Sequence, residues 1–298
     1  MLTGLNNITK TVAFNNATWQ MQPAPGAIRL MTWNVSRFSS PDKIMGANVD
    51  LENKILAVIQ KYHPDILCMQ EYRDMQFTGV QRSVKKKLES LGFVYSAVSN
   101  DTVANKDYGV VIVGTAIFSR IAIKDSGRIS LQQKKNESMA FADFSFNNNP
   151  FRVYTCHLLS FSLYREDILE GVREKNIDKV AYRHKSKTEY RMRKIGLEHQ
   201  KEAAIIRANI AKSPYPVIFC GDLNEVPVSY IYNTVKGDLQ DAFIKKGSGL
   251  GRTFFKLSPT LRIDVCLPSK QFDILQYTCP QVMLSDHFPV ISDFTWAK

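Results

Sequence analysis

The chain has 298 residues, of which 44% are hydrophobic, and its 39 Lys and Arg exceed its 28 Asp and Glu to give a net charge of +11. This length and apolar content can bury a large core, in one domain or in two small ones. A run of about 18 apolar residues, which a membrane-spanning helix requires, is missing from the sequence, and the N-terminus lacks the basic and apolar segments of a signal peptide. The positive charge favours polyanionic partners: nucleic acid, phosphorylated small molecules or an anionic membrane face. A basic protein without such a partner is the alternative.

The chain alternates predicted strands and helices. No repeat, low-complexity tract or linker divides it, so we expect a single domain over residues 27–298 and an N-terminal extension over 1–26 that could contain a first strand. In the first third of the chain the apolar patterns predict strands and helices in turn. The strands cover 27–35 and 65–71, and the helices cover 50–65, which stops at His63-Pro64, and 80–92, which ends at Gly92.

The remainder of the chain is richer in strands. Three strands are predicted first, with a turn at 147–150, then a long polar helix, and then the last three strands. Mixed strand and helix order, with both continuous and alternating apolar strands, predicts an α/β (α+β) sandwich of sheets covered by helices. The six strands cover 109–119, 139–146, 151–158, 215–224, 262–268 and 288–296.

The five cysteines are widely spaced, odd in number and without a Cys-X-X-Cys or zinc-finger spacing. Four of them lie in apolar strand-like runs, which predicts buried free thiols in a reducing compartment. We therefore expect an intracellular, cytoplasmic soluble domain. The residues are Cys68, Cys156, Cys220, Cys266 and Cys279.

The segment from Arg173 to Lys201 is strongly basic, with ten Lys or Arg against four Asp or Glu. It has two interpretations: a solvated helical face, or an arm that contacts substrate phosphates beside the active site. Its aromatic residues, Tyr182 and Tyr190, are too few to indicate base stacking.

Polar residues stand at the ends of five apolar strands. Each has an ordinary explanation alone: a turn asparagine, a core histidine or a capping aspartate. Together, on one chain, they predict a shared site for a metal ion and a phosphate. The residues are Asn34, Glu71, His157, Asp222, Asn224, Asp286 and His287.

The chemistry of these side chains fits phosphoester hydrolysis. Mg²⁺ prefers oxygen ligands, so we expect Glu71 to anchor it with Asn34 and Asp286 nearby. The remaining groups divide the other tasks of in-line attack by water. We expect Asp222 to orient and deprotonate the water, Asn224 and His157 to hold non-bridging phosphate oxygens, and His287 to polarise the phosphate or exchange protons.

These residues carry a resemblance to the endonuclease/exonuclease/phosphatase superfamily, which has the deoxyribonuclease/exonuclease III-like fold. The motifs TWNV, ILCMQE, TCHL, GDLN, RID and SDHFPV occur in the family's order between Arg29 and Phe294. The resemblance implies a four-layer sandwich of two packed mixed β-sheets flanked by helices. It also implies an EC 3.1 hydrolase that depends on Mg²⁺, with Mn²⁺ as a substitute. We expect a monomer and no organic cofactor. By motif position, Asp264 would support His287 as an oriented pair.

The branch of the family is indicated by two further segments. Residues 208–232 and 247–255 are similar to uncharacterised Bacteroidetes-type bacterial members, some of which carry membrane helices before this domain, so a membrane-tethered parent protein is an alternative. The residues NVSRF and QEYR argue against the abasic-site endonucleases, and RIDVCLPS argues against the inositol phosphatases. The chain departs from the family at Val265, where an aromatic residue is usual.

Other histidines match no motif. His63, His184 and His199 are interpreted as surface or helix residues, and no acidic partner for His157 can be found by motif.

The leading hypothesis is therefore a Mg²⁺-dependent phosphodiesterase or nuclease acting on nucleic acid. The alternative is a phosphatase or phospholipid phosphodiesterase (inositol phosphatase- or sphingomyelinase-like) at a membrane face. A silent binding module would require an essential group to be missing, and all seven strand-end residues are present. DNA, RNA, lipid and small phosphate esters remain open as substrates, as do endo- or exo-cleavage, one or two metal ions and the oligomeric state.

Overall fold

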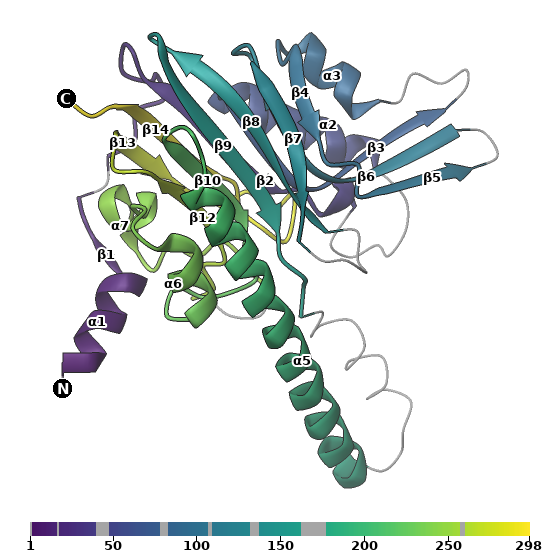
Figure 1. Ribbon diagram of the computed structural model, residues 1–298. Helices are drawn as coiled ribbons and strands as arrows, with labels where there is room; N and C mark the ends of the chain where they lie inside the picture. Colours follow the sequence, from purple (N-terminus) through teal and green to yellow (C-terminus); the bar gives the residue numbers. More distant parts are fainter. Residues whose placement is uncertain are drawn as a thin grey trace.

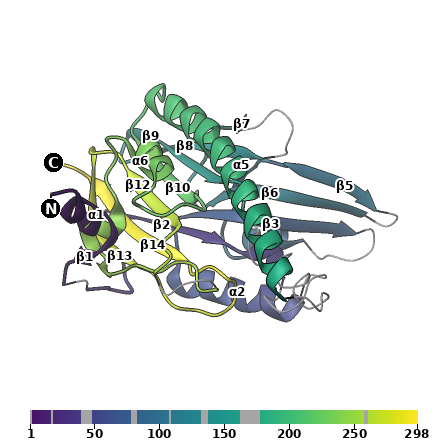
Figure 2. The ribbon, with the colours of Figure 1, turned by 90° about the horizontal axis from the view of Figure 1, so that it is seen from below.

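The structure is a computed structural model, and it describes residues 2–16, 18–39, 48–77, 83–106, 109–131, 137–161, 177–256 and 260–298. Two mixed sheets pack face to face, and helices cover the outer face of each (Figure 1). Seen from below, the order of layers is α5 and α6, one sheet, the second sheet, and α2 (Figure 2). The described part of the chain thus forms the four-layer α/β sandwich that the resemblance implied.

The larger sheet has seven strands in the order β13-β14-β2-β3-β6-β4, with β5 also paired to β6. Strands β2 and β3 are parallel, with Asn34 opposite Gln70, and the other pairs are antiparallel. Its strands are β2 (Ile28–Asn34), β3 (Ile66–Phe77), β4 (Tyr95–Val98), β5 (Thr102–Lys106), β6 (Gly109–Ser119), β13 (Phe272–Thr278) and β14 (Val290–Trp296).

The smaller sheet has five strands in the order β12-β10-β9-β8-β7. Strands β9 and β10 are parallel, and Asp222 at the end of β10 lies opposite both His157 of β9 and Asp264 of β12. Its strands are β7 (Asp125–Ser130), β8 (Ser138–Phe146), β9 (Asn149–His157), β10 (Val217–Asp222) and β12 (Asp264–Pro268).

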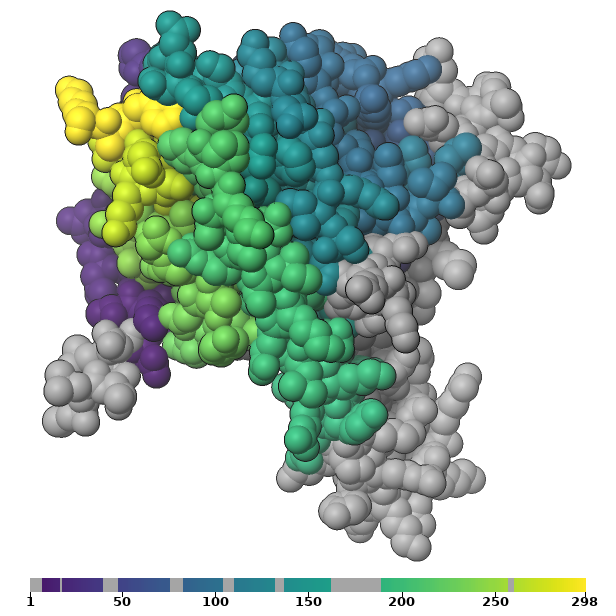
Figure 3. All heavy atoms as spheres, viewed as in Figure 1, coloured from purple at the N-terminus to yellow at the C-terminus, as the bar shows by residue number. Residues whose placement is uncertain are grey.

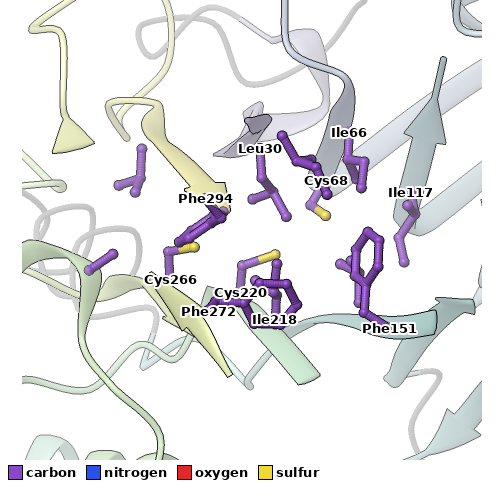
Figure 4. Packing of buried hydrophobic residues seen from close by; sticks show 14 of the residues in the cluster. Leu30, Ile66, Cys68, Ile117, Phe151, Ile218, Cys220, Cys266, Phe272 and Phe294 are labelled. Atoms are coloured by element: carbon purple, nitrogen blue, oxygen red, sulfur yellow. The ribbon is translucent and has the colours of Figure 1, made fainter. Parts of the chain in front are cut away.

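The core between the sheets is apolar and contains three of the cysteines. Cys68 comes from the larger sheet, whereas Cys220 and Cys266 come from the smaller one, and all three lie among aliphatic and aromatic side chains (Figure 4). All five cysteines are free thiols, four of them buried, as predicted. Burial raises the pKa of the Cys68 thiol well above its usual value, so this group stays protonated and apolar.

Two outer clusters complete the layers. Helices α2 (Val49–Tyr62) and α3 (Val84–Ser90) cover the larger sheet, and α5 (Ile177–Ala211) and α6 (Tyr230–Lys236) cover the smaller one. Helix α2 shows how the sequence dictates this layer. The Asn48 side chain caps its first turn, Ile55 and Ile59 are fully buried on one face, and His63 ends it in a left-handed conformation with φ 47°.

The N-terminal residues are joined to the rest of the fold. They form α1 (Leu2–Thr11) and β1 (Ala13–Phe14), which pairs with β11 (Ser248–Gly249) beside α7 (Ala242–Lys246). The buried Arg262 side chain donates to the Lys10 carbonyl at 2.8 Å and pairs with Asp241 at 2.8 Å. None of the described helices combines the length and the apolar character that a bilayer crossing requires.

Several elements differ from their sequence-based predictions. Helix α3 begins only at Val84, after a Ser83 cap, and the predicted residues 80–82 lie outside the described part of the chain. Strand β3 continues to Phe77 because it follows β6 along its whole length. Strands β4, β5, β7 and β13 were not predicted. Strand β7, for example, has the sequence DSGRIS and owes its conformation to pairing with β8 rather than to an apolar pattern.

Candidate active site

Polar side chains from both sheets meet at one end of the sandwich. The parallel strands β2 and β3 end there in one sheet and β9 and β10 end there in the other, while β12 begins there. The Asn34 amide Nδ2 donates to Asp222 Oδ2 at 3.0 Å, which joins the two sheets directly. Residues far apart in sequence are therefore brought together by the packing of the sheets.

Asp222 is held rigidly at the end of a fully buried strand. The preceding residue is Gly221, with φ 147°, where a Cβ atom would lie 2.2 Å from the Cys156 carbonyl oxygen, so only glycine fits beside β9. The Asp222 carboxylate accepts one hydrogen bond from Asn34 and another from the Asn224 backbone N–H at 2.8 Å. Both carboxylate oxygens consequently have fixed directions.

His287 and Asp264 form a buried pair next to Asp222. Nδ1 of His287 donates to Asp264 Oδ2 at 2.8 Å, and its Nε2 lies 3.5 Å from Asp222 Oδ2. Burial disfavours the charged ring, but the Asp264 and Asp222 carboxylates outweigh burial and raise the pKa of His287 to about 10. His287 is therefore an imidazolium at neutral pH, and Asp264 fixes its orientation.

His157 and Asn224 form a second pair on the other side of Asp222. The Asn224 Nδ2 donates to His157 Nε2 at 3.1 Å and to the Leu158 carbonyl at 2.8 Å. The His157 Nε2 lies 3.6 Å from Asp222 Oδ2, and 19% of its side chain is exposed. This pair thus presents an imidazole and a carboxamide toward solvent beside the buried carboxylate.

Glu71 and Asp286 each face a basic side chain. Glu71 lies in a bulge of β3 with a left-handed φ of 48°, and its Oε2 is 3.1 Å from Arg37 Nε. Asp286 Oδ2 lies 3.3 Å from Lys256 Nζ. Burial alone would raise the pKa of Asp286, but His287 and Lys256 hold it below its usual value. Both carboxylates are charged groups that attract cations, and a strained left-handed glutamate is typical of functional sites.

Two sets of residues are candidates for a metal ion. Asp222, Asp264 and His287 have ligand atoms within 4.8 Å of one another, but the two carboxylates raise the pKa of His287 to about 10, so both ring nitrogens carry protons and neither offers a lone pair to a metal ion. Glu71, Asn34 and Asp286 offer oxygen donors from neighbouring positions. Asn34 lies opposite Gln70, the residue before Glu71, and the Ser285 hydroxyl joins the Asn34 carbonyl to Asp286 Oδ1. Oxygen donors of this kind suit a hard divalent ion.

Several supporting residues were not predicted from the sequence. The Trp33 indole donates to the His287 carbonyl at 2.9 Å, and the Ser285 hydroxyl donates to the Asn34 carbonyl at 2.7 Å. Both belong to the TWN and SDH motifs, so a signal was present. Thr253, whose hydroxyl accepts from the Asp264 N–H at 3.1 Å, and Lys256 carry no motif that identifies them.

The three unassigned histidines differ in environment. His63 is exposed at the end of α2, and the side chain of His184 lies outside the described residues. His199 is on helix α5, as expected, but it is fully buried rather than at the surface. Its Nδ1 lies 2.9 Å from Glu225 and its Nε2 lies 2.7 Å from the Leu159 carbonyl.

Solved structures with the same architecture support the fold. A family protein from Bacteroides thetaiotaomicron is similar with a TM-score of 0.61 and 17% identity, covering 93% of this chain and 100% of that one. The human Nocturnin catalytic domain with bound sulfate gives 0.59 and 18%, covering 91% and 94%. D. rerio TDP2 with a single-strand DNA product gives 0.58 and 14%, covering 90% and 99%. At these identities the likeness shows the fold alone.

Sequence comparison gives the family. No curated protein sequence matches the chain significantly, but the sequence model of the Endonuclease/Exonuclease/phosphatase family matches residues 31–287, most of the chain. That range includes every residue of the site described above. The chain therefore belongs to the endonuclease/exonuclease/phosphatase family, whose members are hydrolases that act on phosphoesters and generally depend on a divalent metal.

Proposed function

We propose that the protein is a Mg²⁺-dependent phosphodiesterase that cleaves nucleic acid by in-line attack of water. The observation that carries this proposal is the contact of Asn34 from one sheet with Asp222 from the other, beside the His287–Asp264 and His157–Asn224 pairs. One carboxylate for water and several donors for a phosphate are the groups that this reaction requires.

Asp222 acts as the base toward the attacking water. Its carboxylate is fixed by the Asn34 amide and the Asn224 N–H, so its free lone pairs point in defined directions. A base held in this way removes the proton of a water molecule that it also orients, which contributes about 10²–10⁴-fold to the rate.

The phosphate is held by the donors around Asp222. The His287 imidazolium offers positive charge and an N–H on one side. On the other side the Asn224 amide and the His157 ring, which are hydrogen-bonded to each other, would turn from that mutual contact to a bound phosphate oxygen. As negative charge grows on the phosphoryl oxygens, these donors bind it more strongly than they bind the ground state.

Glu71, Asn34 and Asp286 would hold the Mg²⁺ ion, for which Mn²⁺ would substitute. Bound there, the ion would neutralise charge on the phosphoryl group and stabilise the departing oxygen. Asn34 is suited to this position because its Oδ1, which accepts the Ser36 N–H at 3.0 Å, retains a second lone pair.

Nucleic acid is proposed as the substrate because of charge. The net charge is +11, and α5 extends well beyond the body of the molecule (Figures 1 and 3). Its described, exposed residues include Arg193, Lys194 and Lys201; residues 173–176 of the predicted basic segment lie outside the description. The single-strand DNA product in the similar D. rerio TDP2 structure supports the same substrate class.

One substrate panel tests the proposal. It contains plasmid, single-stranded DNA, RNA, a phosphoinositide, sphingomyelin and a chromogenic phosphodiester, each with Mg²⁺, with EDTA and with the Asp222→Asn variant. We expect Mg²⁺-dependent cleavage of a nucleic acid that weakens steeply with rising salt, since several phosphate contacts release counterions. Preferred cleavage of the phosphoinositide or sphingomyelin would overturn the nucleic-acid assignment in favour of the membrane-face alternative.

A further inference from the structure

His199 lies fully buried on α5 and contacts two loops of the active site. Its Nδ1 is 2.9 Å from Glu225 Oε1, and its Nε2 is 2.7 Å from the Leu159 carbonyl oxygen. The Phe161 ring packs against the imidazole edge at a centroid distance of 5.0 Å. No step of the proposed reaction uses this histidine, although both of its ring nitrogens have hydrogen-bond partners.

The two contacts of His199 lead directly to the phosphate-binding pair. Leu159 is two residues after His157, at the end of β9, and Glu225 is the residue after Asn224, beyond the end of β10. The Asn224 amide also joins the two loops, because it donates to His157 and to the Leu158 carbonyl. One side chain from a helix therefore ties together the two loops that carry His157 and Asn224.

Both partners of His199 are hydrogen-bond acceptors. A carboxylate and a carbonyl oxygen cannot donate, so each contact requires an N–H on the ring, and only the imidazolium has two. A neutral ring would leave one buried acceptor facing a lone pair. Burial lowers the pKa of His199, but the hydrogen bonds to Glu225 and Leu159, with the nearby Glu202 of α5, outweigh it and raise the pKa.

We propose that His199 is a positioning residue, an imidazolium clamp that holds the His157 and Asn224 loops at the spacing that phosphate binding requires. The assignment rests on the proposed function for its effect on catalysis, but the clamp itself is a property of the structure. It acts through His157 and Asn224 and does not touch the substrate.

The charge state is tested first, without any substrate. In ¹⁵N-labelled protein, both ring nitrogens of His199 are expected to carry protons at pH 7. Glu225→Gln removes the carboxylate that contributes most to raising the pKa of His199, so it is expected to lower the titration midpoint of this ring. His63→Asn, at an exposed helix end, identifies one of the other histidine signals and serves as the control. A singly protonated His199 at pH 7, or an unchanged midpoint in Glu225→Gln, would overturn the clamp.

The effect on catalysis is tested by pH profiles. His199→Gln can serve only one of the two acceptors, and we expect kcat/KM to fall by about 10–100-fold, as for other residues that orient a site's direct contacts. Glu225→Gln keeps an acceptor oxygen for His199, so the variant should fold and its kcat/KM should match that of wild type at pH 6. As the pH rises, its activity should fall at a lower pH than that of wild type, because its His199 loses the proton earlier. A merely structural histidine would leave the profile of Glu225→Gln superimposed on wild type.

The two experiments separate two kinds of failure. If wild type cleaves no phosphoester in the panel, the proposed function fails while the NMR result still decides the clamp. If wild type is active and His199→Gln and Glu225→Gln keep wild-type kcat/KM at all pH values, the positioning role fails while the proposed function stands.

Discussion

Asp222 accepts hydrogen bonds at both carboxylate oxygens, from the Asn34 amide and the Asn224 N–H. An asparagine at position 222 would have only one acceptor oxygen for these two donors. The Asn34 amide cannot rotate by 180° to present its oxygen instead, because its Oδ1 accepts the Ser36 N–H. Asp222→Asn should therefore reduce kcat by about 10³-fold or more by removing the base and also reduce the free energy of unfolding by about 1–3 kcal/mol.

The measurement for Asp222→Asn combines turnover of a chromogenic diester with urea unfolding. Asp238→Asn, at an exposed ion pair with Arg207, is the matched control and should change neither quantity appreciably. Activity of Asp222→Asn within tenfold of wild type would exclude its role as the base.

Glu71 and Arg37 should affect metal binding in opposite ways, because Glu71 is a proposed ligand and Arg37 competes with the ion for its carboxylate. If Glu71 binds Mg²⁺, Glu71→Gln should raise the Mg²⁺ concentration for half-maximal binding by tenfold or more, because a neutral amide attracts the ion less. Arg37→Gln should lower it, since the Arg37 guanidinium lies 3.1 Å from the same carboxylate. Displacement of bound Mn²⁺ by Mg²⁺, followed by magnetic resonance, measures both, and shifts in the same direction would contradict this assignment.

Single residues were predictable from the sequence where an apolar strand stops abruptly. Asp222, Asn34 and His157 follow buried strands, so their location at a shared end follows from sheet geometry. His199 was not predictable in this way, because its environment depends on how α5 packs over loops distant in sequence. The position of His199 in the helical sequence pattern does not distinguish it from any other residue of an amphipathic helix.

At the scale of elements, α5 offers a test of the substrate class. Reversing the exposed Arg193 and Lys194 to Glu should reduce nucleic-acid cleavage about tenfold or more near 0.1 M salt, because phosphate contacts are lost, and leave the chromogenic diester unaffected. The control is the same charge change at Lys245 and Lys246 of α7, which lies away from the projecting end of α5 (Figure 1).

The outcome is read from kcat/KM on both substrates as a function of salt. Urea unfolding first checks that both variants are folded. In folded variants, equal losses on nucleic acid and on the small diester, or equal effects of the α5 and α7 reversals, would contradict a phosphate-binding role of α5.

Elements with a strong local pattern were predictable, whereas those formed by pairing were not. Helix α2 has both a cap and an apolar face, and β10 is a continuous buried run, so each was predicted to within a few residues. Strands β5 and β7 lack such patterns and are set by their neighbours β6 and β8. The bulge that turns Glu71 is likewise a product of the β3–β6 register.

At the scale of the whole molecule, the N-terminal segment packs at the edge of the sandwich, beside α7, which contacts β13 of the larger sheet and β12 of the smaller one. Deleting residues 1–16 removes the Lys10 carbonyl from the buried Arg262 and the two hydrogen bonds of Asn15 to the Ile244 and Gly247 carbonyls. We expect the free energy of unfolding to fall by about 2–3 kcal/mol, with kcat unchanged because none of these groups lies in the site.

Urea unfolding and diester turnover measure the two effects of this deletion. Asn15→Ala, which removes only the two Asn15 bonds, should show a smaller part of the same loss. An unfolding midpoint equal to that of wild type would show that the N-terminal segment contributes nothing to the domain.

The contact between Asn34 and Asp222 links the candidate active site to the interior of the protein. Packed sheets lie about 10 Å apart, and here that separation is set by side chains such as Cys68, Cys220 and Phe151 between them (Figure 4). If Asn34 and Asp222 act in catalysis as proposed, a substitution that thickens or thins the apolar interior should change turnover, because it moves the side of the site that carries Asn34 relative to the side that carries Asp222.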